Sequence, residues 1–256
     1  MYADTTDMAK ALKPKPFLLI GLLCCAPLAS ARSADMQTLD GVAIDRTEVS
    51  VGQFRRFVDA TGFVTKAEKA AGGLVYDAGW QQKAGWIWSA PFGIPAEESE
   101  PAVHVTFDEA DAYCRWAGKR LPTDAEWVKA AYTETRTDPP APFEAGATYE
   151  YPTGPDPRGA NCRDECGHVP AVDFSDRLAR GAGHAPVGTT RAGVNGLYDM
   201  GANVWEWTEN GGDDEKGTRG GSWWYGASQM KADAVATKPR DMAVVYIGFR
   251  CAKDAG

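Results

Sequence analysis

The sequence predicts a loop-rich globular fold that combines short helices with short strands, and three observations support this. First, the 256 residues include nine Trp and 28 Gly, a composition typical of irregular packing in which large rings fill gaps and glycines provide unusual turns. Second, three capping boxes predict the starts of three helices. Third, β-like runs lie near both ends of the chain. The length allows one large domain or two small ones, and 44% hydrophobic residues allow a sizeable core.

The N-terminal region has the pattern of a signal peptide. Three lysines precede an apolar run over residues 17–26, and small residues follow at 29–31. The run is shorter than the roughly 20 residues that a membrane-spanning helix needs. We therefore expect a signal peptide over residues 1–31, a domain over 32–256 that is periplasmic or secreted, and no stable membrane anchor after cleavage.

The net charge argues against one class of partner. The formal charge is −8 at pH 7, and no basic stretch is available to meet a phosphate backbone. Nucleic acid is therefore not an expected partner.

Four cysteines remain after the predicted signal peptide, an even number in an oxidising compartment. Two disulfides are expected, and three pairings are possible. We favour Cys162–Cys166, which closes a small loop, together with Cys114–Cys251. A zinc site is a weaker alternative, because only two of the four lie close together and no second close pair exists.

The first predicted elements are a strand and a helix. Residues 36–48 carry Val42 and Ile44 on one face of an expected strand. Ser50 and Gln53 then form a capping box, which predicts a helix that ends at Gly62.

The middle of the chain alternates irregular and regular segments. Residues 72–100 show no persistent period and are expected to pack on their own tryptophans. Residues 101–105 resemble a short buried strand, in which His104 is a core or surface histidine rather than a metal ligand. Capping boxes at 106–109 and 123–126 predict two further helices. Beyond them we expect a surface excursion over 137–158 and a β-like run over 244–251.

The stretch from Asn195 to Trp207 alternates aromatic bulk with oxygen donors. Asp199, Asn203 and Glu206 stand among Tyr, Met and two Trp. One interpretation is a buried loop whose oxygens converge on Ca²⁺. The other is a helix start, capped by Asp199 or Asn203, with the tryptophans as ordinary core.

Four stretches together resemble the formylglycine-generating enzyme family, also called the sulfatase-modifying-factor domain. They are Arg46-Thr47-Glu48-Val49-Ser50, residues 112–123 with Arg120-Leu121-Pro122-Thr123, residues 196–207, and Arg219-Gly220-Gly221-Ser222-Trp223 leading to Gly248-Phe249-Arg250-Cys251. The resemblance covers about residues 36–254. It implies a single α+β domain with an irregular, loop-rich fold related to C-type lectins, and a Cys114–Cys251 disulfide.

The resemblance also implies structural calcium. The ligands it suggests are Asp199, Gly201, Asn203 and Glu206, with the glycine contributing a carbonyl. A second site would use Asn161 and a later Asp, which has no clear counterpart because residues 173–183 depart from the pattern.

The copper chemistry of the family is not expected here. Its oxygen-dependent members bind copper with two cysteines that follow the Gly-Gly-Ser-Trp block. Those positions fall at Tyr225 and Met230 in this chain, so the thiolates that hold Cu(I) are absent. We expect Met230 to fill the core rather than bind metal, and no copper-dependent formylglycine formation.

Two functions follow from the resemblance. The first is an exported oxidoreductase that acts on a small molecule or a protein side chain, with copper or iron left open. Its expected pocket consists of Trp205, Ser222, Trp223, Tyr225, Met230 and Arg250. The alternative is a non-catalytic maturation, accessory or binding protein for a periplasmic metalloenzyme such as a copper nitrite reductase. A carbohydrate-binding role rests on fold analogy alone.

Overall fold

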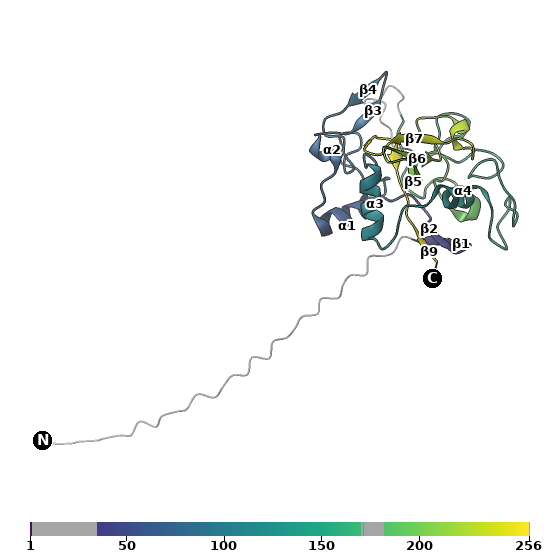
Figure 1. Ribbon diagram of the computed structural model, residues 1–256, viewed down its shortest axis with the longest axis horizontal. Coiled ribbons are helices and arrows are strands. Elements are labelled where there is room, and N and C mark those ends of the chain that lie inside the picture. Colours follow the sequence, from purple (N-terminus) through teal and green to yellow (C-terminus); the bar gives the residue numbers. More distant parts are fainter. Residues whose placement is uncertain (2–34, 170, 172–181, 256) are drawn as a thin grey trace. The chain divides into compact units, whose positions relative to one another are not determined.

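The predicted first strand is a hairpin whose second strand also pairs with the C-terminal part of the domain (Figure 1). Strands β1 (Met36–Leu39) and β2 (Val42–Asp45) are antiparallel, and β2 also pairs with β9 (Ala252–Asp254). The prediction of one strand over residues 36–48 was wrong because Asp40 and Gly41 form a tight turn, with φ of 40° and 87°. Positive φ at both central residues suits a two-residue hairpin.

A computed structural model describes residue 1 and residues 35–169, 171 and 182–255. The predicted signal peptide therefore lies outside the described residues, except for residue 1. The chain from Ala34 to Gly256 forms one compact unit. Across the described part of the chain, no helix combines the length and apolar character needed to span a bilayer.

All three predicted capping boxes start a helix. They begin α1 (Val51–Thr61), α3 (Phe107–Trp116) and α4 (Asp124–Tyr132), and in each the cap hydroxyl and the third helical residue bond reciprocally. Gly62 ends α1 in the left-handed conformation, as predicted. A fourth box, which the sequence analysis missed, begins α2 (Lys66–Lys69).

The segment after α2 is largely irregular, as expected, but it contains a short hairpin. Strands β3 (Leu74–Tyr76) and β4 (Trp80–Gln82) pair with each other. Trp86 and Trp88 are buried in the core, whereas the tryptophan that starts β4 is 52% exposed. The expectation that this segment packs on its own tryptophans therefore holds for two of the three.

Residues 101–105 are buried but do not form the predicted strand. Their only ladder contact among the described residues is an isolated bridge between Ser50 and Pro101. His104 has a φ of 57°, which interrupts an extended strand. Its ring is fully buried and Nε2 lies 2.9 Å from the Pro91 carbonyl oxygen, so it is a core histidine. Burial lowers its pKa to about 4.

The second half of the chain forms a four-stranded sheet in the order β7-β6-β5-β8. Its members are β5 (Trp205–Gly211), β6 (Glu215–Arg219), β7 (Ala236–Pro239) and β8 (Ile247–Gly248). Neighbouring strands are antiparallel except β5 and β8, which are parallel. The predicted β-like run over 244–251 therefore contributes only the two residues of β8. Two 3₁₀ turns, η1 (Val194–Gly196) and η2 (Ala227–Met230), lie on either side of β5 and β6 in sequence.

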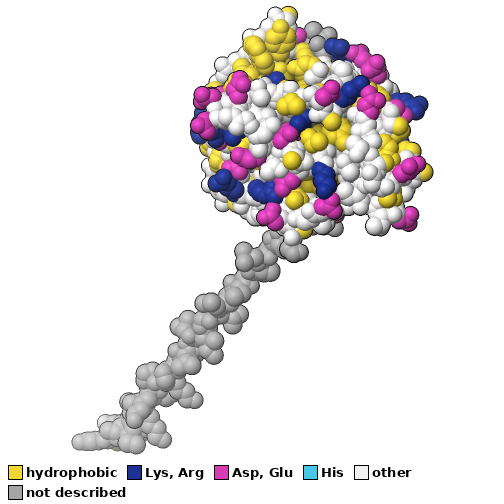
Figure 2. Space-filling view, turned by 45° about the vertical axis from the view of Figure 1, so that its right-hand side comes forward, with side chains coloured by type: hydrophobic (Ala, Val, Ile, Leu, Met, Phe, Trp, Pro, Cys, Tyr) yellow, Lys and Arg dark blue, Asp and Glu magenta, His cyan; other side chains and the backbone are white. Residues whose placement is uncertain are grey.

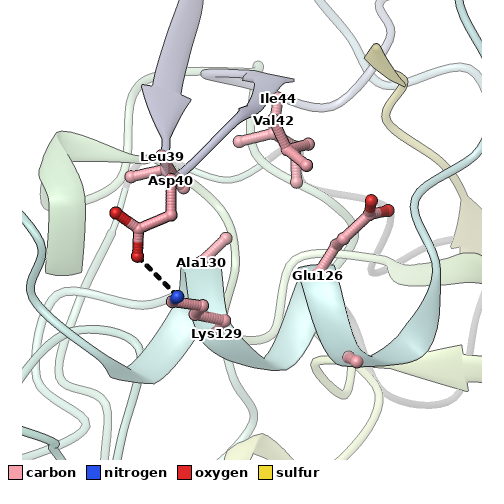
Figure 3. A pocket seen from close by; sticks show the side chains of 8 residues that line it. Leu39, Asp40, Val42, Ile44, Glu126, Lys129 and Ala130 are labelled. Atoms are coloured by element: carbon pink, nitrogen blue, oxygen red, sulfur yellow. Dashed lines mark ion pairs between the residues drawn. The ribbon is translucent and has the colours of Figure 1, made fainter. Parts of the chain in front are cut away.

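Helix α4 packs beside the β1–β2 hairpin and leaves an apolar groove there (Figure 3). Leu39, Val42 and Ala130 line it, and Lys129 Nζ pairs with Asp40 at 2.5 Å across one side. On the face shown in Figure 2, Lys and Arg are interspersed with Asp and Glu rather than gathered into one basic area.

Candidate functional site

The stretch over 195–207 is a buried loop that leads into a strand, and it contains no α-helix. Four of its non-glycine residues, Asn195, Asp199, Ala202 and Asn203, have φ between 52° and 59°. Left-handed residues at this density cannot form the first turn of a right-handed helix, and no helix begins between Asp199 and Trp205. The alternative in which Asp199 or Asn203 caps a helix was therefore wrong.

Asn203 joins segments that are distant in sequence. Its Oδ1 accepts hydrogen bonds from Asn161 Nδ2 at 3.0 Å and from the Ala185 N–H at 2.7 Å, and its Nδ2 donates to Glu48 Oε2 at 2.7 Å. Asn203 is fully buried. A buried amide without hydrogen-bond partners costs free energy. The hydrogen bonds of Asn203 therefore stabilise the left-handed loop conformation that places its side chain among these partners.

Glu206 and Arg250 form a fully buried ion pair. The two carboxylate oxygens accept from Arg250 Nε and Nη2 at 2.7 Å each, and Oε2 also accepts from Trp127 Nε1 at 2.7 Å. The remaining Arg250 donors reach the carbonyl oxygens of Asp45 and Tyr198. Because side chains alternate along a strand, this pair lies on the face of β5 opposite Trp205. The structure thus separates Arg250 from the expected pocket.

The predicted calcium ligands already have protein partners. Asp199 accepts from the Gly188 N–H and Thr190 Oγ1 at 2.6 and 2.5 Å, and the Asn203 and Glu206 oxygens are occupied as described above. Within the described ranges, no group of three His, Cys, Asp or Glu is placed to hold a metal. In this arrangement the set does not fit one Ca²⁺, which needs six to eight free oxygens.

The other two predicted ligand positions lie in packed surroundings. Gly201 packs on Met230, whose Cε would lie 2.6 Å from a Cβ at that position. Asn161 donates to the Gly183 carbonyl at 3.1 Å. Residues 172–181, most of the segment expected to hold the Asp of a second site, lie outside the described ranges. Calcium binding stays a prediction.

Among the described residues, buried carboxylates outnumber buried cations around this loop. Burial raises the pKa of Glu48 well above its usual value, and the charges of Asp199 and Glu206 raise it further. Burial also raises the pKa of Asp199. Arg250 is the cation that offsets them. Sequence analysis missed Glu48 as a member of this group, because nothing in residues 46–50 indicates that they meet residue 203.

We expect this excess charge to make folding stability depend on pH. Because the folded-state pKa of Glu48 is raised, the folded chain holds that proton more tightly than the unfolded chain does. The stabilisation is present below the ordinary value of 4.5 and is lost as pH rises through the raised value. Urea unfolding from pH 5 to pH 8 should therefore show that the free energy of unfolding declines less steeply with pH in Glu48→Gln than in wild type.

The same urea unfolding measurements from pH 5 to pH 8 also test the calcium prediction. A Ca²⁺ ion among these carboxylates would lower their pKa values, so excess calcium should abolish the decline and a chelator should restore it. Identical curves with calcium and with chelator would contradict calcium binding at this loop.

On the other face of β5, a continuous set of rings forms what we call the aromatic cluster. Neighbouring ring centroids lie 5.1 to 6.1 Å apart along the series Trp205, Tyr225, Tyr246, Trp224 and Trp223. The indole N–H groups of Trp205 and Trp223 are buried and have no acceptor among the residues that the structure describes. A buried donor without a partner is uncommon in proteins, so these two N–H groups make the cluster a candidate ligand site.

Lys238 on β7 lies against the aromatic cluster. Its Nζ is 5.9 Å from the Trp205 ring centroid, and burial lowers the pKa of its ammonium group. Sequence analysis missed this residue, because only the pairing of β7 with β6 brings it to the site.

The remaining expected pocket residues do not join the cluster. Ser222 is buried in a turn. Its carbonyl oxygen accepts from the Tyr225 backbone N–H at 2.9 Å, and its Oγ accepts from the Trp224 backbone N–H at 3.4 Å. Met230 packs instead in a small cluster with Cys166 and Ala202. Of the expected set, the structure brings together Trp205, Trp223 and Tyr225.

Both predicted disulfides are present and confirm the pairing. Cys114–Cys251 joins α3 to the segment before β9, and Cys162–Cys166 closes a loop with a sequence separation of 4.

Comparison with known proteins defines the class. The irregular α+β domain matches the solved structure of PvdO from Pseudomonas aeruginosa with a TM-score of 0.55 at 19% identity, covering 84% of this chain and 80% of that one. A model of the sulfatase-modifying factor enzyme 1-like domain matches residues 24–255. The chain belongs to this family, and its fold is that of formylglycine-generating enzymes.

The curated relatives include active and inactive proteins. The formylglycine-generating enzyme of Thermomonospora curvata is 34% identical, over 82% of this chain and 81% of its own. The inactive C-alpha-formylglycine-generating enzyme 2 of Mus musculus is 30% identical, over 86% and 77%. Hercynine oxygenase of Mycolicibacterium thermoresistibile is 28% identical, over 76% and 42%. Family membership thus supports an oxidase-like or accessory role.

Proposed function

We propose that this chain is an exported oxidoreductase of the family, periplasmic or secreted, that acts on a small molecule or a protein side chain without copper-dependent formylglycine formation. The observation that carries the proposal is the aromatic cluster, with Lys238 at its edge and two buried indole donors that find no acceptor in the described part of the chain. Aromatic walls with a few polar groups are typical of small-ligand sites.

The chemistry of these side chains supports binding and proton transfer. Trp205 and Trp223 would donate hydrogen bonds to a polar atom of the substrate, and the rings would exclude water. Lys238, with its lowered pKa, would move a proton during the reaction. A redox metal, copper or iron, would supply electron transfer when bound.

We expect turnover to depend on Lys238. Purified protein would be assayed for oxygen consumption over candidate thiols and catechols, with metal content measured on the same sample. Lys238→Met should lower turnover by about 100-fold, the lower range for loss of a general acid or base. Lys253→Met changes an exposed lysine on β9 and should leave turnover unchanged. Equal turnover in all three proteins would contradict this role for Lys238.

The absence of formylglycine formation is tested separately. A peptide containing a substrate cysteine, incubated with the protein, copper and oxygen, should yield no aldehyde by mass spectrometry. Tyr225 and Met230 stand where the resemblance places the copper cysteines, and aldehyde formation would contradict this part of the proposal.

A second candidate is a non-catalytic accessory or binding protein for a periplasmic metalloenzyme, such as a copper nitrite reductase. The substitutions at Tyr225 and Met230 favour it, and so does the similarity to a relative that is named as inactive. A lack of oxygen uptake with every candidate substrate, together with co-purification of a metalloenzyme, would favour this candidate over the first.

A further inference from the structure

The short disulfide loop lies directly beside Met230. Cys166 Sγ is 3.7 Å from Met230 Sδ, and the two side chains are 1% and 0% exposed. A disulfide sulfur carries no hydrogen, so this is a direct contact between two sulfur atoms. Ala160, Ala202 and Ala227 complete the apolar surroundings. Cys162 lies in the same cluster but is only partly buried.

Two hydrogen bonds fix this arrangement from opposite sides. The Arg163 N–H inside the loop donates to the Tyr225 carbonyl oxygen at 2.9 Å, which fastens the loop to the segment that carries Met230. Tyr132 Oη donates to the Met230 carbonyl oxygen at 2.6 Å and is itself buried. Hydrogen bonds therefore hold both the disulfide loop and the Met230 backbone at the contact between the two sulfur atoms.

We propose that reduction of the Cys162–Cys166 disulfide creates a Cu(I) site with three sulfur ligands: Cys162, Cys166 and Met230. Thiolates and thioethers are soft ligands that favour Cu(I). With metal–thiolate bonds of about 2.3 Å, as in zinc sites, two sulfurs that share one metal lie roughly 3.8–4.0 Å apart. The observed contact between Cys166 and Met230 is close to that spacing. This inference does not rest on the proposed function.

The step that opens the site is a thiol–disulfide exchange with an external dithiol. The reductant's thiolate attacks Cys162 Sγ, which is accessible beside the exposed residues 163–165, and Cys166 leaves as a thiolate. The second thiol of the reductant then resolves the mixed disulfide. One dithiol is oxidised and one disulfide is reduced. Cu(I) binding afterwards releases a proton from each cysteine thiol.

The site would differ from the one implied by the family resemblance. It shares the position of Met230, but the position of Tyr225 contributes only a backbone carbonyl, because the tyrosine ring belongs to the aromatic cluster. The other disulfide is not expected to open under the same conditions, because Cys114 and Cys251 are both fully buried.

The test is an anaerobic Cu(I) titration of the folded protein. The protein is treated with dithiothreitol and desalted, and alkylation with mass spectrometry should locate the new thiols at residues 162 and 166 only. Titration against a bicinchoninate competitor should show about one Cu(I) per reduced chain and none for the oxidised chain. Cys162→Ser/Cys166→Ser should abolish binding.

Met230 provides the decisive comparison. Met230→Leu keeps apolar bulk but removes the sulfur, and it should weaken Cu(I) binding at least about 10-fold, since loss of even an outer-shell partner costs that much at metal sites. Met200→Leu, in a different buried cluster, should not change it. A reduced protein that binds no Cu(I), equal affinity in Met230→Leu, or a disulfide that resists reduction in the folded state would each overturn the proposal.

Discussion

Replacement of Arg250 by methionine should lower the free energy of unfolding by about 3–5 kcal/mol, the usual cost of removing one partner of a buried ion pair. The variant leaves the Glu206 carboxylate buried with Trp127 Nε1 as its remaining donor, and it removes the donors to the Asp45 and Tyr198 carbonyl oxygens. Urea unfolding at constant pH measures the loss. A change below about 1 kcal/mol, the typical value of an exposed pair, would show that the pair does not hold this part of the core.

A double variant separates the lost charge pairing from lost packing. In Arg250→Met/Glu206→Gln, the carboxylate that paired with Arg250 is removed as well, and the amide oxygen introduced at position 206 can still accept from Trp127 Nε1. We expect the double variant to be more stable than Arg250→Met alone, as removing both charges of a buried pair is often tolerated. The coupling energy from the full cycle then reports the ion pair itself.

Removal of the Cys114–Cys251 disulfide should have an effect of similar size. The bond joins residues with a sequence separation of 137, so its loss frees a long loop in the unfolded chain, worth about 5 kcal/mol by loop-closure entropy. Both sulfurs are fully buried, and alanine at both positions avoids a buried hydroxyl. Urea unfolding of Cys114→Ala/Cys251→Ala measures the loss.

The second disulfide is the matched control. Its separation is 4 residues, and the same entropy argument gives about 2 kcal/mol for Cys162→Ala/Cys166→Ala. A larger loss for the short loop than for the long one would contradict the assignment of Cys114–Cys251 as the main covalent constraint on the fold.

The helices could be predicted because their signals are local. Each capping box places donor and acceptor three residues apart, so Ser50 with Gln53 specifies a helix start whatever surrounds it. Strands were harder to predict because a strand forms only where the segment pairs with another segment of the chain. The run over 244–251 looks like one strand, but its residues pair with different segments: Val244 with Leu74, and β8 with β5. Only the two residues of β8 therefore form a strand within this run.

The site could be predicted only in part, for a related reason. The alternation of Trp and acid in 203–207 correctly indicated burial. It could not show that Glu206 meets Arg250, or that Asn203 meets Glu48, because those contacts span 44 and 155 residues. An acid between two strand tryptophans faces the opposite side of the sheet from them. Its partner there proved to be a guanidinium group, which the resemblance to a calcium loop did not anticipate.

The pairing of β2 with β9 has a consequence for how the domain matures. Almost the whole domain separates these two strands in sequence, so a growing polypeptide cannot complete its first sheet until β9 has been synthesised. Until then one edge of β2 is an open template for other chains. A nascent chain of this protein should therefore need a holdase during synthesis, and fragments that stop before β9 should aggregate.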